Sequence, residues 1–215
     1  VFIPIAENQG LIAPLTRYVL TETHRQLALF PPSPHFHIGI NVAASHFGHG
    51  ELIADLNHHW FKVRPVQQLV IELTERDSLS EADFRIVREL HRMGVMVAID
   101  DFGTGNTSLS WLEKLSPDIL KIDKSYINAI GTDAVNSTVT DMIIALGKRL
   151  KLEMVAEGVE TPQQAAYLRL RGVHVLQGYL YAKPMPLKDF PGWLAASIPP
   201  PARHNGKMMP SMPLQ

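Results

Sequence analysis

The sequence predicts an α/β fold, most simply a TIM-like (β/α) barrel, from two observations. Six short β-rich runs recur along the chain, and segments that read as helices separate them. Strands that alternate with helices in this way are typical of parallel βα units, which both the doubly wound sheet and the closed barrel use. The six runs are His37–Val42, Gln68–Leu73, Val95–Asp100, Ile119–Asp123, Glu153–Glu157 and His174–Tyr179.

Helices are expected between these runs because apolar residues recur there at helical spacing. Ser80 with Asp83, and Thr161 with Gln164, are expected to cap two of the helices at their N-termini. The expected helices are Leu11–Leu29, Glu51–His58, Glu81–Met93, Ser137–Leu150 and a last one from Thr161 to about Gly172.

A complete barrel has eight strands and typically about 250 residues. This chain has 215 residues and six expected strands, so we expect an N-terminally truncated barrel that lacks its first two strands. The domain is expected to cover residues 1–197. Residues 198–215 are expected to form a disordered tail, because they are rich in Pro and Met and have no periodic pattern.

The composition limits the kinds of partner and site. The formal net charge of -1 argues against broad binding to DNA, RNA or anionic lipid. The absence of cysteine excludes disulfides and thiolate metal sites. No apolar run approaches the roughly 20 residues of a membrane span. We therefore expect no membrane contact from this segment and a cytoplasmic location, with any inner-membrane anchor of the parent protein lying before Val1.

Side-chain alternation predicts which strand-end residues face the mouth of the barrel. In Ile71-Glu72-Leu73 the aliphatic side chains face the helices, so Glu72 faces inward. Lys121 and Asp123 share the inward side of their strand for the same reason. The residues expected around one mouth are Asn41, Glu72, Asp100, Lys121, Asp123, Glu157 and Gln177.

This many carboxylates cannot lie together unpaired, because mutual repulsion and desolvation would raise their pKa values and destabilise the fold. A single lysine is too little compensation, so we expect one or two divalent cations. Oxygen ligands favour Mg²⁺, Mn²⁺ or Ca²⁺ over zinc. Paired metals beside a lysine are suited to activating water for attack on a phosphodiester.

Several of these residues also fit simpler structural roles. A lone Asp or Glu at a strand end is more often a helix cap, and Glu75 and Glu160 could be such caps. Asp123 could be a structural partner of Lys121. Asp101-Phe102-Gly103 matches the kinase metal motif, but no glycine-rich nucleotide loop accompanies it. Carboxylates and a lysine would also fit an enolase-type barrel, which uses Mg²⁺ for proton abstraction.

Taken together, the motifs resemble those of the EAL-domain family, which are bacterial phosphodiesterases of cyclic di-GMP. The resemblance runs from about Phe2 to Ala195 and implies hydrolysis of cyclic di-GMP to linear pGpG. The matching motifs are Phe2-Ile3-Pro4-Ile5-Ala6-Glu7, Asn41-Val42-Ala43, Glu72-Leu73-Thr74-Glu75, Asp100-Asp101-Phe102-Gly103-Thr104-Gly105, Leu120-Lys121-Ile122-Asp123, Ala156-Glu157-Gly158-Val159-Glu160 and Gln177-Gly178-Tyr179.

The resemblance also implies roles for the matching residues. Lys121 would hold the attacking water, Glu157 would act as general base, and Glu75 would support catalysis by anchoring a loop. That loop, from Phe102 through Gly103, Thr104 and Gly105 to Ser108, would couple a homodimer to catalysis. The implied ligands of two Mg²⁺ or Mn²⁺ ions are Asn41, Glu72, Asp100, Asp101 and Glu157. The implied substrate-binding residues are Asp123, Gln177 and Gly178.

The chain departs from the family in two ways. The Glu-Ala-Leu motif that names the family is absent, in agreement with two missing strands, and its glutamate is a metal ligand. We therefore expect residues 1–215 alone to be poorly stable and inactive, and we expect the parent protein to be an active phosphodiesterase. Asn106-Thr107 replaces the commoner aromatic-serine pair in the loop.

The alternative function is a regulatory module that senses cyclic di-GMP, or binds a protein partner, without hydrolysis.

Overall fold

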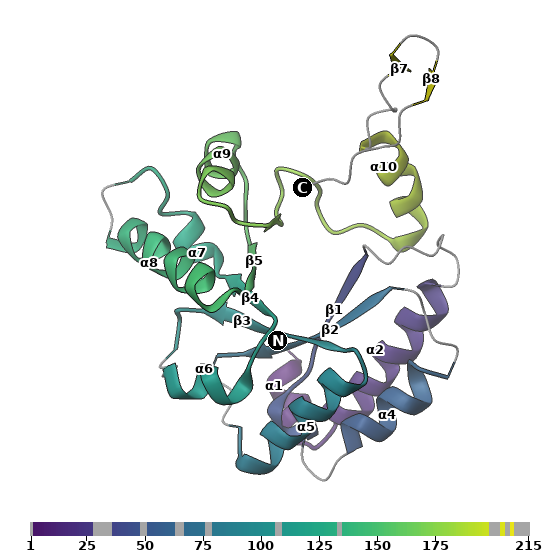
Figure 1. Cartoon of the computed structure of the whole chain (residues 1–215). Coiled ribbons are helices and arrows are strands. Elements are labelled where there is room, and N and C mark those ends of the chain that lie inside the picture. The colour runs from purple at the N-terminus through teal and green to yellow at the C-terminus, as the bar shows by residue number, and fades with distance from the viewer. Residues whose placement is uncertain are drawn as a thin grey trace. The chain divides into compact units, whose positions relative to one another are not determined.

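The structure of the chain is a computed structural model. It describes residues 2–27, 36–47, 51–62, 67–75, 79–105, 109–132, 135–197, 203–204 and 207–208. The chain divides into two compact units, Val1–Tyr181 and Ala182–Gln215. The first unit holds a parallel sheet with helices packed against it (Figure 1).

All six expected strands are confirmed. Each strand pairs in parallel with the next one along the chain, in the order β1-β2-β3-β4-β5-β6. A doubly wound sheet reverses its strand order at a switch point, and this sheet does not, so the six strands form a half-barrel. The strands are β1 (His37–Asn41), β2 (Gln68–Thr74), β3 (Met96–Phe102), β4 (Ile119–Ile122), β5 (Glu153–Ala156) and β6 (Val175–Leu176).

The five helices expected from periodicity are also confirmed. They are α2 (Ile12–Leu27), α4 (Glu51–His59), α5 (Glu81–Arg92), α8 (Val135–Leu150) and α9 (Pro162–Leu170). Among the described residues of the first unit, four shorter helices were not predicted, because four to seven residues are too few to show a helical period. They are α1 (Ile3–Asn8), α3 (Ala44–Phe47), α6 (Leu109–Leu115) and α7 (Lys124–Ile127).

The two faces of the sheet bury different sets of apolar residues. Alternate residues such as Ile71, Ile99 and Leu120 belong to the large core shared with the helices. On the other face, Val70, Ala98 and Ile119 form a small separate cluster, joined by Met96 and Val155. Four of these five residues lie two positions before Glu72, Asp100, Lys121 and Glu157 on their strands. The inner cluster is therefore the apolar floor beneath a polar mouth.

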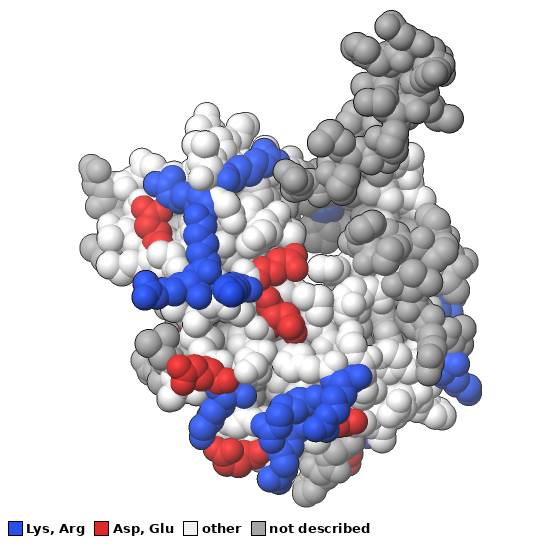
Figure 2. Space-filling model, viewed as in Figure 1, with Lys and Arg blue, Asp and Glu red and all other residues white. Residues whose placement is uncertain are grey.

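The surface of the first unit carries interspersed charges. In Figure 2, Lys and Arg side chains lie beside Asp and Glu side chains on the face that is viewed. Several of these charges form ion pairs, such as Arg171 with Asp141 and Lys114 with Glu81. Exposed pairs of this kind contribute little to stability, so the buried core and the mouth hold the fold together.

The second unit contains a 3-10 helix η2 (Leu187–Asp189), α10 (Phe190–Ser197) and the antiparallel strands β7 (Arg203–His204) and β8 (Lys207–Met208). Apart from these two short strands, the predicted disordered tail lies outside the described residues. The domain boundary at residue 197 stays a prediction. Among the helices that the structure describes, none has both the length and the apolarity needed to cross a membrane.

Two helix starts follow the expected capping chemistry closely. Before α9, the Thr161 hydroxyl accepts from the Gln164 N–H, and the Gln164 side chain accepts from the Thr161 N–H. Before α5, Ser80 and Asp83 form the same reciprocal pair. These caps satisfy backbone N–H groups that have no partner within the helix.

We predict that Thr161→Ala lowers the free energy of unfolding by about 1 kcal/mol, because the Gln164 N–H loses its acceptor. Thr161 is exposed, so the change removes no core packing. Urea unfolding followed by circular dichroism measures the effect, with Thr161→Ser as a matched control that keeps the hydroxyl. Equal stability of the Ala and Ser variants would contradict the capping argument.

Candidate active site

Lys121 is the central residue at the mouth of the sheet. It lies on β4, and its Nζ contacts carboxylates from three directions: Glu72 at 2.8 Å, Asp100 at 3.0 Å and Glu157 at 2.8 Å. Its side chain is only 8% exposed. Alternation predicted that Glu72, Asp100, Lys121 and Glu157 face inward. The structure brings these four residues together.

Burial and charge act in opposite directions on these groups. Burial alone would lower the pKa of Lys121, but the charge of Glu72 and the hydrogen bonds to Glu157 and Glu72 raise it well above its usual value. Burial raises the pKa of Glu157, hydrogen bonding and attraction from Lys121 offset only part of this, and Asp100 and Glu72 raise it further. The lysine stays charged, while the carboxylates around it retain an excess of negative charge.

Two adjacent aspartates reach the mouth because β3 is irregular there. Ile99 pairs with Leu120 and Phe102 with Ile122, so three steps along β3 match two steps along β4. Asp101 adopts a φ of 53°, in the left-handed region, and its N–H donates to Asp100 Oδ1 at 2.9 Å. Such a bulge redirects a side chain that regular alternation would turn toward the helices. Phe102 then returns to the main core, where it is buried.

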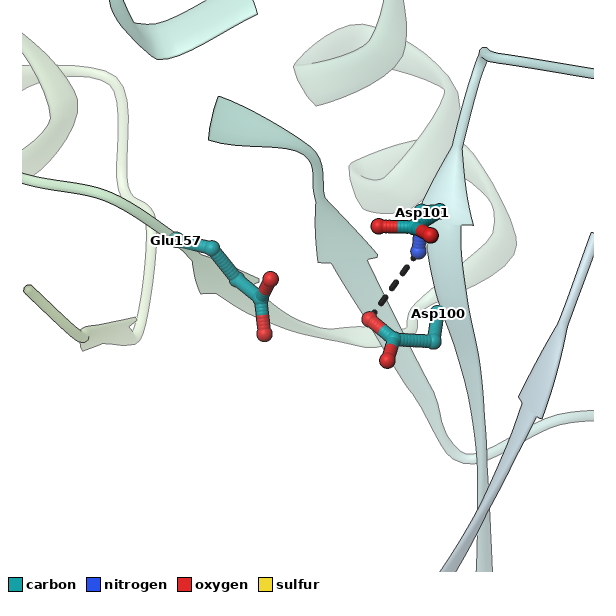
Figure 3. A group of neighbouring side chains, drawn as sticks. All are labelled: Asp100, Asp101 and Glu157. Atoms are coloured by element: carbon teal, nitrogen blue, oxygen red, sulfur yellow. Dashed lines mark hydrogen bonds between the residues drawn. The ribbon is translucent and has the colours of Figure 1, made fainter. Parts of the chain in front are cut away.

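The arrangement fits a divalent cation. Asp100, Asp101 and Glu157 each offer a carboxylate oxygen, and these atoms lie within 4.8 Å of one another (Figure 3). Burial, followed by repulsion from Asp100 and Asp123, raises the pKa of Asp101. With Glu72 included, the mouth holds four carboxylates and one ammonium group, which contacts three of them. Hard oxygen ligands with excess negative charge are suited to divalent cations such as Mg²⁺, Mn²⁺ or Ca²⁺.

A glycine on β1 leaves room for one of these carboxylates, a residue that the sequence analysis missed. A Cβ added at Gly39 would lie 2.1 Å from Glu72 Oε1, so the carboxylate occupies the space that a side chain would fill. The signal was a glycine on the inward side of a strand two residues before Asn41. Asn41 itself pairs with Glu72 in the sheet register and is exposed at the mouth.

Asp123 has a different environment from the one that alternation implies. β4 ends at Ile122, and the Asp123 carboxylate accepts from the Ser125 N–H at 2.9 Å as the N-cap of α7. Burial opposes this, but hydrogen bonds from Ser125 and Lys124 leave the pKa of Asp123 lowered. Its charge still acts on Asp101. The structural role of Asp123 is therefore that of a helix cap rather than a pair with Lys121.

The segment after β5 packs closely against the segment after β6. The Val159 N–H donates to the Gln177 carbonyl at 3.0 Å, and a Cβ at Gly178 would lie 2.2 Å from the Val159 carbonyl oxygen. Gly178 thus has a packing reason to be glycine, and Gln177 is exposed beside it. The substrate contacts predicted for Asp123, Gln177 and Gly178 stay predictions.

Glu75 holds the loop after β3, as the resemblance implied. Its Oε2 accepts from the N–H groups of Gly103 at 2.8 Å and Gly105 at 2.7 Å, and the side chain is buried. The Thr104 N–H and hydroxyl both donate to the Asp101 carbonyl. Residues 106–108 of the predicted dimer loop lie outside the described residues.

Comparison with known proteins adds independent findings. Residues 1–184 match the family model described as "EAL domain". The "Probable cyclic di-GMP phosphodiesterase PdeD" of Escherichia coli (strain K12) is 68% identical over 215 residues, which cover 100% of this chain and 40% of that protein. The chain therefore spans about two fifths of the length of this relative.

Solved structures agree with this similarity. The structure described as "PaMucR Phosphodiesterase, c-di-GMP complex" superposes with a TM-score of 0.79 at 37% identity, over 88% of this chain and 78% of that chain. A manganese/cy-diGMP complex of Klebsiella pneumoniae BlrP1 superposes with a TM-score of 0.66 at 25% identity, over 81% of this chain and 44% of that chain.

We predict that Glu157→Gln stabilises the metal-free protein at neutral pH. The folded state raises the pKa of Glu157, so the wild-type protein loses stability as the pH rises from about 4.3, the usual value, through the folded pKa. The glutamine variant lacks this loss, so its advantage grows from pH 4 to pH 7. Urea unfolding in a chelator at both pH values measures it.

The control for this prediction is Glu113→Gln, which removes one exposed charge on α6 away from the mouth. It is expected to change stability equally at both pH values. An advantage of Glu157→Gln that shrinks with rising pH would show that the folded state lowers the pKa of Glu157, so that attraction from Lys121 outweighs burial.

Proposed function

Because the chain belongs to the EAL domain family, we propose that it is the domain with which its protein hydrolyses cyclic di-GMP to linear pGpG, using divalent cations. The observation that carries the proposal is the set of strand-end carboxylates that surround Lys121 beside Asp101. The printed names of PdeD and of the PaMucR complex support the same substrate.

Oxygen atoms of this chain would hold the cations. We assign Mg²⁺ or Mn²⁺, two per site, to Glu72, Asp100, Asp101 and Glu157, with the exposed amide of Asn41 completing the set. The manganese complex of BlrP1 supports the choice of a hard divalent ion. When bound, such ions offset the charge of a phosphodiester and lower the pKa of a nucleophilic water.

The remaining steps use groups whose positions the fold fixes. Lys121 stays protonated at neutral pH, so its ammonium can orient the attacking water or steady charge on the phosphate. Glu157 has a pKa shifted toward neutrality, which improves a carboxylate as a general base. In this proposal the water oxygen bonds to phosphorus as Glu157 accepts its proton. A P–O ester bond of the ring breaks, and the leaving oxygen takes up a proton from solvent, which gives the linear product.

Two further parts of the proposal concern assembly. We propose a homodimer through the Phe102–Ser108 region, where Phe102 is buried in the core and Gly103 and Gly105 are held by Glu75. A dimer contact there would act on the loop that follows Asp100 and Asp101.

The inactivity expected of residues 1–215 alone also stays a prediction.

We predict that Asp100→Asn lowers turnover of cyclic di-GMP by orders of magnitude and leaves the fold intact, because it removes a charged metal ligand but keeps the volume. The assay follows pGpG with Mg²⁺ or Mn²⁺ in the full-length protein that carries residues 1–215. Asp189→Asn, an exposed change in the second unit, is the matched control. The same assay on residues 1–215 alone measures the activity of this segment.

The possible outcomes separate the two functions. Wild-type turnover in Asp100→Asn would refute the ligand assignment. Tight binding of cyclic di-GMP by the wild-type protein without any pGpG would instead support a sensing module. Neither binding nor hydrolysis would refute both.

A further inference from the structure

We propose that Tyr126 is a positioning residue, whose hydroxyl group fixes the loop after β3 and so holds Asp101 at the mouth. The proposal rests on the proposed function in one respect, because it takes Asp101 to be a metal ligand. Tyr126 lies on α7, a four-residue helix that the sequence analysis did not predict.

Tyr126 is anchored in the fold at its backbone and contacts the loop through its ring. Its carbonyl accepts from the hydroxyl of Thr140 on α8 at 3.0 Å, and Thr140 is completely buried. Its own hydroxyl donates to the Gly103 carbonyl. A Cβ added at Gly103 would lie 2.8 Å from a ring carbon of Tyr126, so the ring packs directly on that peptide.

The Gly103 residue is therefore held from two sides. Its N–H donates to Glu75, on the segment after β2, and its carbonyl accepts from Tyr126, on the segment after β4. The peptide units on both sides of Gly103 are thus each bonded to a side chain, so neither unit can rotate without breaking a hydrogen bond. Glu75 accepts from the N–H groups of Gly103 and Gly105, whereas Tyr126 donates to the Gly103 carbonyl, so the two side chains hold different groups of the loop.

The loop needs this support because its backbone is unusual. Asp101 has a φ of 53° and Gly103 a φ of 94°, both in the left-handed region. For a residue with a Cβ this conformation costs energy, and it persists where the surrounding contacts enforce it. The Asp101 carbonyl is tied to Thr104 within the same turn, so fixing Gly103 also fixes Asp101.

The hydroxyl group of Tyr126, in addition to its ring, holds the loop. Burial, followed by the charges of Glu75 and Asp123, raises the pKa of Tyr126, so the phenol remains protonated and is a donor. Phenylalanine would fill the same volume but would leave the Gly103 carbonyl without this partner. Tyr126→Phe therefore separates positioning by the hydroxyl from packing by the ring.

The test compares Tyr126→Phe with the wild type in the protein that carries residues 1–215. In the metal-free state, amide hydrogen exchange at Gly103 and Gly105 is expected to accelerate, while exchange in β2 and β4 stays unchanged. Mn²⁺ affinity is expected to fall by about 3- to 10-fold, the effect of one hydrogen bond. For cyclic di-GMP, kcat is expected to fall with little change in KM.

Two further variants serve as a negative and a positive control. Tyr18→Phe removes a hydroxyl from an exposed tyrosine on α2 and is expected to change none of these measurements. Glu75→Gln is expected to accelerate exchange at the same two glycines. Wild-type exchange and wild-type Mn²⁺ affinity in Tyr126→Phe would overturn the proposal, as would uniform acceleration across the sheet. A wild-type protein that binds no Mn²⁺ would refute the proposed function, yet exchange in the metal-free protein would still decide the role of Tyr126.

Discussion

The buried ammonium of Lys121 is the interaction on which the rest of the mouth depends. It lies within 3.0 Å of carboxylates from β2, β3 and the end of β5, so these segments must remain in register around β4. The apolar floor of Val70, Ala98 and Ile119 excludes water beneath it and strengthens each ion pair. Removing the lysine would leave several carboxylates partly buried without a counter-charge.

The same cluster carries more negative than positive charge, and this supports our proposal that it is a functional site rather than a structural ion pair. A network serving stability alone would match its charges, whereas here the pKa values of Asp101 and Glu157 are both raised. The surplus carboxylate of Asp101 reaches the mouth only through the bulge in β3. Glu75 and Tyr126 then hold the turn that follows it.

Sequence reasoning succeeded wherever the strands are regular. Alternation placed Glu72, Lys121 and Glu157 correctly, because nothing interrupts β2, β4 or β5 before those residues. Alternation alone did not account for two aspartates. Asp101, which the resemblance implied as a ligand, turns to the mouth at a register shift between β3 and β4. Asp123 acts on Asp101 through its charge, as a residue at the mouth would, but it also caps a helix too short to show a period. The role of Gly39 was also missed, because this glycine leaves room for Glu72, which is distant in sequence.

A double-mutant cycle between Lys121→Met and Glu72→Gln in the metal-free protein tests the central claim most directly. If Lys121 holds the carboxylates together, its loss costs much less when Glu72 is already uncharged. We expect a coupling free energy of unfolding above about 1 kcal/mol at neutral pH. Effects that add to within about 0.5 kcal/mol would show that the two residues act independently and would contradict the account.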